Sequence, residues 1–227
     1  MERSVALGCF CGLLALSQPI TAQESLPAEK IRDISPDQKF AMRISYDADS
    51  NKQLIESGKA DSAKIFSETI KSIELVTLPA RDKVLELLPS DDGGTNYDHV
   101  TLLWSADPNW YAFYYDQPRV GYTSVYHRAG DKFTPVNKPD ELVVDATKGL
   151  KDADVRNEYV QPLRWTKPGV LLLDQLSIFR GGEIDDAKFQ LTAGLDPKTG
   201  KFQVVSKKKL PADVKRNNKT TNRTSTR

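Results

Sequence analysis

Short apolar segments alternate with turn-forming residues along most of the chain, and this pattern limits the fold more than any other feature of the sequence. The clearest example is a hairpin in which Asp196-Pro197-Lys198-Thr199-Gly200 separates strands at 189–195 and 202–205. Asp-Pro favours the start of a turn, and glycine accepts the positive backbone angle that such a turn needs. Further segments with strand composition lie at 40–46, 72–87, 100–104, 110–115 and 121–127. Many short strands of this kind predict a mainly β fold built from antiparallel sheets.

One stretch departs from the strand pattern. Between Ser50 and Ser72, apolar residues recur partly at helical spacing among Lys, Glu and Ser, which fits either a helix or a long hairpin arm. The sequence therefore predicts a short helical segment near 52–70.

Three segments of the chain resemble one another. They cover 34–41, 103–113 and 163–171, and each joins a hydroxyl residue, a turn and an apolar strand. A strand–turn–strand pattern follows each of them downstream. The shared logic is that a hydroxyl or Asp side chain closes a tight turn on nearby backbone, so that the next strand enters the sheet.

These segments resemble the blade repeat of TolB-type and prolyl-oligopeptidase-type β-propellers, in which a Ser-Pro-Asp-Gly-Lys-like turn precedes an inner strand. Ser35-Pro36-Asp37-Gln38-Lys39 is the closest match, followed by Ser105-Ala106-Asp107 and then Thr166-Lys167-Pro168-Gly169. The resemblance implies a partial, propeller-like array of about three blades, whereas propellers close with four to eight. The repeats start at 35, 105 and 166, a longer spacing than a typical blade. An open β-sandwich and a ring completed by other copies of the chain are the alternatives.

The first 22 residues have the composition of a secretory signal peptide. Arg3 provides a charged start, Val5 to Leu16 an apolar run, and Ala22 a small residue before the polar Gln23. The apolar run is too short to cross a bilayer, so we expect no transmembrane segment. Both cysteines lie within 1–22, so the processed protein would have no disulfide and no thiol chemistry. We expect a periplasmic or secreted protein.

The chain is expected to divide into four parts. A signal peptide covers 1–22, a polar leader 23–33, a single β-rich domain 34–210 and a disordered basic tail 211–227. The residues from Lys207 to Arg227 include eight Lys or Arg and one acid, whereas the body before them is acidic. A tail with so little apolar surface cannot offset its ordering entropy. Export and an acidic body argue against nucleic-acid binding.

Several catalytic and metal-binding patterns do not fit the sequence. No Gly-x-Ser-x-Gly elbow occurs, and His99 and His127, the only histidines, fall in or beside expected strands. Asp47-Ala48-Asp49-Ser50-Asn51 begins like a calcium loop, but Lys52 and Gly58 stand where glycine and glutamate are needed. We therefore predict no metal site and no cofactor. A glycosidase would need two carboxylates, for which the candidates are Asp107, Asp116, Asp174, Glu183, Asp185 and Asp186.

Aromatic residues are concentrated between Trp104 and Tyr126. Such a strand is either buried between layers or exposes one face, and exposed tyrosine and tryptophan can stack on sugars or fill a partner's pocket. The functional reading is a binding face formed by Trp110, Tyr114, Arg119 and Tyr122.

The leading functional hypothesis is an exported, soluble, non-catalytic binding or interaction module of a bacterial envelope. Its partner would be an unidentified envelope protein or a polysaccharide, and the chain could form a homo-oligomer. The alternative is a carbohydrate-active hydrolase that uses two of the acids named above.

Overall fold

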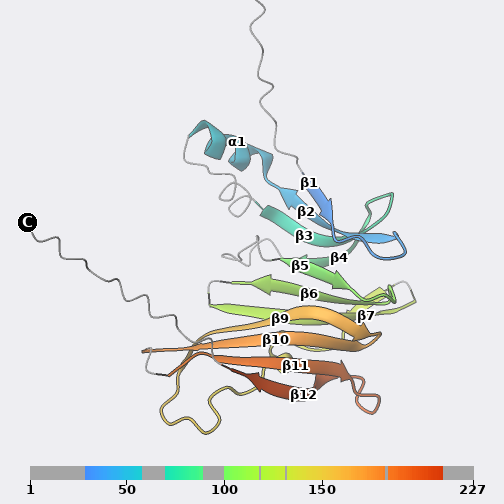
Figure 1. Cartoon of the computed structure of the whole chain (residues 1–227). Coiled ribbons are helices and arrows are strands. Elements are labelled where there is room, and N and C mark those ends of the chain that lie inside the picture. Colours follow the sequence, from blue (N-terminus) through green and yellow to red (C-terminus); the bar gives the residue numbers. More distant parts are fainter. Residues whose placement is uncertain are drawn as a thin grey trace, which may run out of the picture.

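The computed structural model of the chain describes residues 29–57, 70–88, 100–117, 119–130, 132–181 and 184–211. Strands dominate it, and the expected mainly β architecture with antiparallel sheets is confirmed. The strands form three four-stranded antiparallel groups, which we call the first, second and third meander. The second meander lies between the other two (Figure 1).

The first meander is a separate sheet. It contains β1 (Glu29–Arg32), β2 (Phe40–Tyr46), β3 (Ile70–Thr77) and β4 (Lys83–Leu88), in that order. The last residues of the expected leader include β1, which pairs with β2 and places Ile31 opposite Arg43. The predicted signal peptide and the predicted basic tail beyond Pro211 lie outside the described residues.

The helix α1 (Ala48–Glu56) lies between β2 and β3 and starts earlier than predicted. Asp47 Oδ1 accepts the backbone N–H of Ser50 at 2.8 Å, as a residue that caps a helix N-terminus does. The aspartate that resembled a calcium ligand therefore begins a helix. Ile70, the last residue of the predicted helical span, starts β3, while 58–69 lie outside the described residues.

The second and third meanders share one sheet. The second contains β5 (Thr101–Trp104), β6 (Trp110–Asp116), β7 (Val120–Ala129) and β8 (Lys132–Pro135). The third contains β9 (Val155–Lys167), β10 (Val170–Phe179), β11 (Ala187–Leu195) and β12 (Phe202–Leu210), which confirms the predicted hairpin at 189–205. The two meanders join where β7 and β9 run parallel, at the pairs Val120–Glu158 and Gly121–Tyr159.

Two serines form the same turn between the first and second strands of their meanders. The Ser35 N–H donates to the Phe40 carbonyl at 2.8 Å, and the Ser105 N–H donates to the Trp110 carbonyl at 2.9 Å. Ser35 Oγ also accepts the backbone N–H of Phe40 at 3.0 Å. The corresponding turn of the third meander uses Gly169, whose φ is +71°. Whether these meanders are propeller blades in the sense of the resemblance stays a prediction.

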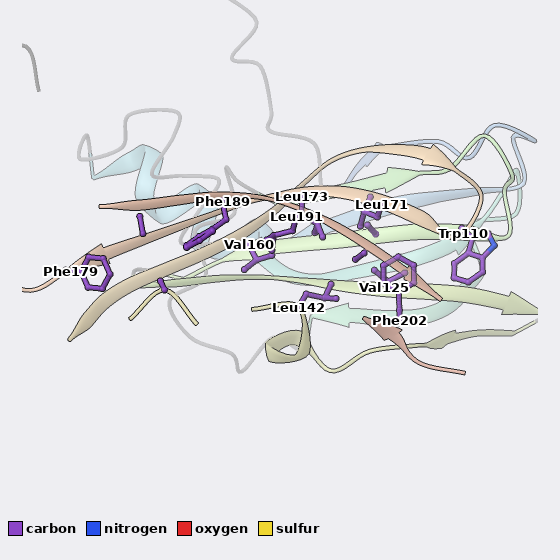
Figure 2. Close-up of a cluster of buried hydrophobic side chains, with 14 residues drawn as sticks. Trp110, Val125, Leu142, Val160, Leu171, Leu173, Phe179, Phe189, Leu191 and Phe202 are labelled. Carbon is purple, nitrogen blue, oxygen red and sulfur yellow. The ribbon is translucent and has the colours of Figure 1, made fainter. Parts of the chain in front are cut away.

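Two hydrophobic clusters hold the three meanders together. Side chains from β2 and β3, among them Met42 and Leu75, pack against Tyr111 and Phe113 of β6. The opposite face of the second meander packs against the third, as Figure 2 shows. This second cluster contains Trp110, Ala112, Val125, Val160, Leu171, Leu173, Leu191 and Phe202. Strand β6 is therefore buried on both faces, which explains its run of aromatic and apolar residues.

A tryptophan at the end of the first strand ties each later meander to the one before it. Trp104 Nε1 donates to the Asp33 carbonyl of the first meander at 2.7 Å. Trp165 Nε1 donates to the Leu103 carbonyl of the second meander at 3.0 Å. In both cases the acceptor lies two residues before the turn serine of its meander. The stack therefore uses one docking contact twice.

The segment between β8 and β9 covers a stretch of β7 that neither strand reaches. Asn137 Oδ1 accepts the Val125 N–H at 2.7 Å, and its Nδ2 donates to the Thr123 carbonyl at 3.1 Å. A 3-10 helix at Pro139–Leu142 follows and brings Leu142 into the cluster between the second and third meanders. Buried backbone groups of β7 thus find partners in a side-chain amide.

Replacing Trp165 tests the docking contact. Trp165→Phe keeps an aromatic ring but removes the N–H donor and leaves space at the layer boundary, so we expect a loss of about 2 kcal/mol in the free energy of unfolding. Tyr111→Phe is the control, because its hydroxyl is buried and no described residue hydrogen-bonds to it. Removing that hydroxyl should leave stability unchanged or raise it. Urea unfolding followed by tryptophan fluorescence measures both; equal losses would contradict the assignment.

Candidate functional site

The structure separates the four residues of the predicted binding face. Trp110 is buried between the second and third meanders, with its ring tilted against that of His127 and the ring centroids 4.1 Å apart. Tyr114 is opposite Thr123, and Tyr115 is opposite Tyr122, so Tyr114 and Tyr122 lie on opposite faces of their sheet. Arg119 lies in the turn before β7. Of the four, Tyr114 lines a cavity, and a binding role for any of them stays a prediction.

This cavity has a volume of about 560 Å³, within the range of small-molecule sites. The end of β6 and the strands of the third meander surround it. Its described lining consists of Tyr114, Asp116, Gln117, Tyr159, Gln161, Asp174, Gln175, Leu176, Lys188, Phe189 and Leu210. Tyrosine, glutamine, aspartate and lysine side chains contribute hydrogen-bonding groups to it, and the tyrosine rings, leucine and phenylalanine residues contribute apolar surface.

Strand alternation brings the polar side chains of the third meander to one place. Asp174 is opposite Gln161, and Leu176 is opposite both Tyr159 and Lys188. These residues alternate with Leu171, Leu173 and Leu191, which enter the core. The side chains of Asp174, Leu176 and Lys188 therefore lie on the face of β10 and β11 that points away from the core.

Gly121 of β7 allows the side chains of Tyr114 and Tyr159 to approach each other closely beside this cavity. A methyl group at Gly121 would overlap the Tyr114 hydroxyl and would lie 3.0 Å from Tyr159 Cδ1. The φ angle of Gly121 is not in the left-handed region, so glycine is needed here for space. Burial raises the pKa of Tyr114, and the nearby Asp116 carboxylate and Tyr159 add to the rise. The Tyr114 hydroxyl therefore stays protonated and able to donate a hydrogen bond.

Asp174 is the most unusual group in the cavity. Its Oδ1 is buried, and no described residue donates a hydrogen bond to it. Burial raises the pKa of this carboxyl group, while the charge of Lys188 acts in the opposite direction. A buried acceptor without a donor costs free energy, so the ionised form of Asp174 is disfavoured.

The structure also sorts the six carboxylates proposed for glycosidic cleavage. Asp116 and Asp174 line the same cavity. Asp107 Oδ1 instead accepts the backbone N–H of Asn109 in the turn between β5 and β6. Asp185 and Asp186 are exposed before β11, and Glu183 lies outside the described residues, as does His99.

Sequence reasoning did not find Tyr159, Gln161 and Lys188. The available signal was the alternation in β11, where Lys188 and Gln190 are interleaved with Phe189 and Leu191. That pattern shows which side chains share a face. It does not show that β6 comes close to the same face, because the parallel pairing of β7 with β9 joins segments far apart in the chain.

A second polar cluster lies beside the cavity, around Glu158 of β9. Glu158 Oε1 accepts hydrogen bonds from Ser177 Oγ at 2.9 Å and from Gln175 Nε2 at 3.0 Å. Gln175 also bonds both the N–H and the carbonyl of Val144, which anchors the segment before β9. Burial raises the pKa of Glu158, and these hydrogen bonds only partly oppose the rise.

Comparison of the chain with protein-family models, with curated proteins and with solved structures found no match. In the described parts of the chain, no three His, Cys, Asp or Glu side chains are grouped as metal ligands would be. No described helix is long and apolar enough to cross a membrane.

Gly121→Ala should disturb the cavity more than the fold. The added methyl group forces Tyr114 away, so we expect destabilisation of about 1–3 kcal/mol and shifts in the NMR signals of Tyr114 and Tyr159. Combining it with Tyr114→Phe removes the hydroxyl that the methyl group meets and should restore part of the loss. If the double variant is no more stable than Gly121→Ala alone, this steric account is wrong.

Glu158→Gln should stabilise the protein most at neutral pH. The folded-state pKa of Glu158 lies above its ordinary value of 4.5. At pH values between 4.5 and the raised pKa, the folded protein therefore binds more protons than the unfolded chain. Its contribution to stability therefore falls as pH rises through the folded pKa. Glutamine keeps an acceptor oxygen and carries no charge, so the variant's advantage should grow from acidic to neutral pH.

Glu141→Gln is the matched control for that experiment. The Lys138 backbone N–H donates to Glu141 at 2.8 Å and lowers the pKa of this carboxyl group, with Lys201 contributing. The contribution of ionised Glu141 to stability is present above pH 4.5 and is lost as the pH falls through its lowered folded-state pKa. The two variants should therefore show opposite pH trends in urea unfolding midpoints. Parallel trends would contradict the assigned cause.

Proposed function

We propose that this chain is an exported, non-catalytic binding module of a bacterial envelope, and that its cavity holds a polar group of an envelope polymer. The observation that carries the proposal is the cavity that β6 and the third meander form together, with hydrogen-bonding side chains from both in its lining. Tyrosine, glutamine and aspartate side chains recognise polar groups by hydrogen bonds and stacking. The export signal expected at 1–22 supports the envelope location.

A hydrolase is the second candidate, because Asp116 and Asp174 line the same cavity. The raised pKa of Asp174 suits a general acid that protonates the leaving glycosidic oxygen. Asp116 would then activate the water that adds to the anomeric carbon as the glycosidic bond breaks, or would attack that carbon itself. This reading predicts product release, which a binding module does not give.

Binding to immobilised bacterial envelope polysaccharides, followed by surface plasmon resonance, tests the proposal. We expect at least one polysaccharide to bind the purified protein, and Gln161→Ala to weaken that binding about tenfold through a lost hydrogen bond to the ligand. Gln161 is exposed at the cavity, so its loss should leave the fold intact. Gln203→Ala, at an exposed position of β12 away from the cavity lining, is the control and should bind as the unchanged protein does.

The same samples distinguish the two candidates. Release of new reducing ends by the unchanged protein, and its loss in Asp174→Asn, would support the hydrolase and contradict the non-catalytic module. Binding that Gln161→Ala leaves unchanged would place the ligand elsewhere and would contradict the role of the cavity.

A further inference from the structure

We infer that the outer edge of β12 binds an extended acidic segment of another polypeptide, which adds to the sheet as a further strand. β12 is the last strand of its sheet, and it lies at the edge of the third meander (Figure 1). The site is a sheet edge and needs no ligand in the cavity, so it is independent of the proposed function.

The backbone of β12 is paired along one side. There β11 pairs with it over its whole length, from Phe202 to Leu210. On the other side, among the described residues, the Val136 carbonyl accepts the Phe202 N–H at 2.8 Å. Backbone from outside β11 therefore already bonds to the start of this edge. An edge strand presents a row of N–H and C=O groups, and an added strand forms main-chain hydrogen bonds to them.

Three lysines make this edge basic. Lys207, Lys208 and Lys209 follow one another on β12, and all three are exposed. β11 and β12 together contain four lysines and no acidic residue. Hydrogen bonds from Thr147 lower the pKa of Asp145, and the charge of Lys207 contributes, so this one acid lies near the first lysine. Opposite charges at facing positions of neighbouring strands attract, so the strand that fits these lysines carries acidic residues.

The positions of the lysines define the partner further. Side chains of consecutive strand residues point to opposite faces, so Lys207 and Lys209 share one face and Lys208 lies on the other. A partner strand that matches them carries acids at three consecutive positions, one opposite each lysine. A lipid surface lying on either face of the sheet would contact only the lysines of that face. The arrangement therefore favours an acidic strand over a membrane.

The same lysines oppose pairing of β12 with a second copy of the chain. Two β12 strands side by side would gather six lysines along one ribbon, where like charges repel. Lysine on an edge strand commonly prevents such self-pairing. An acidic strand gains from the charges that a second copy must overcome, so the edge discriminates between the two.

Two peptides test the charge of the partner. Each has nine residues and blocked ends, with threonine and valine outside and either three glutamates or three glutamines at the centre. The central position lets the glutamates face the lysines in either strand direction. We expect the glutamate peptide to bind the purified protein about tenfold more tightly, through three cross-strand pairs. Backbone amide shifts of β12 in the NMR spectrum report the binding. No shift of these signals, or equal binding of the two peptides, would overturn the acidic partner.

Methylation of the peptide backbone tests strand addition. Consecutive N–H groups of a strand point to opposite sides, so methyl groups on alternate nitrogens block one side and leave the other open. Of two glutamate peptides methylated on the two alternate sets, one should lose its binding to β12 and the other should keep it. Equal binding of these two peptides would show a contact made by charge alone and would contradict strand addition.

A double variant connects the preference to the lysines. Lys208→Gln with Lys209→Gln should remove most of the preference for the glutamate peptide. Lys151→Gln with Lys167→Gln is the matched control, because these lysines are also exposed, lie outside β12 and change the net charge equally. The control should keep the preference. If the first variant keeps it as well, the peptide binds elsewhere and the inference fails.

Vesicles of phosphatidylglycerol test the other anionic occupant. Sedimentation with these vesicles that the Lys208→Gln, Lys209→Gln variant loses, together with equal binding of the two methylated peptides, would assign the lysines to a lipid surface and overturn the strand partner. Gln161→Ala should leave peptide binding unchanged, because Gln161 lies on β9 and not at this edge. Failure of the strand partner is therefore distinguishable from failure of the proposed function.

Discussion

The structure depends on the contact by which each meander binds the one before it. Trp104 and Trp165 each pack a half-buried ring at a layer boundary and donate the indole N–H to a carbonyl two residues before a turn serine. The ring supplies apolar area, and the hydrogen bond fixes where along the neighbouring strand the ring can lie. Hydrophobic burial alone is not directional and would allow the layers to slide. The tryptophan donor lies on the first strand of the second and of the third meander. The turn after that strand then sets the positions of the remaining strands.

The cavity is a consequence of this stacking combined with one short parallel pairing. Where β7 meets β9, the second and third meanders form a continuous sheet, and elsewhere they pack face to face. The change between the two arrangements leaves space at the end of β6. Gly121 leaves room for the Tyr114 hydroxyl, since a Cβ atom at position 121 would overlap it. The polar groups gathered there come from strands whose other face forms the core, so a rigid scaffold holds them.

Sequence reasoning predicted the strands well where local chemistry decides them. The hairpin of β11 and β12 follows from Asp196 and Gly200, because a turn of five residues is specified by its own sequence. Placement in space could not be predicted in the same way. The composition of the aromatic run around Trp110 is compatible with either exposure or burial. Trp110 is buried because a neighbouring meander covers each face of β6. Tyr159, Gln161 and Lys188 were missed because the pairing of Gly121 with Tyr159 brings together positions that share no local signal.

The repeated tryptophan contact also gives the stack a direction. At its beginning, the position equivalent to Trp104 and Trp165 is held by Ile34, whose side chain is 53% exposed. At its far end, the carbonyl equivalent to those of Asp33 and Leu103 belongs to Arg164, two residues before Thr166. The two ends of the stack are therefore chemically different. Pairing of two copies about a two-fold axis would join identical ends. Any association that continues the stacking order must therefore be heterologous, with the first meander of one molecule on the third meander of another.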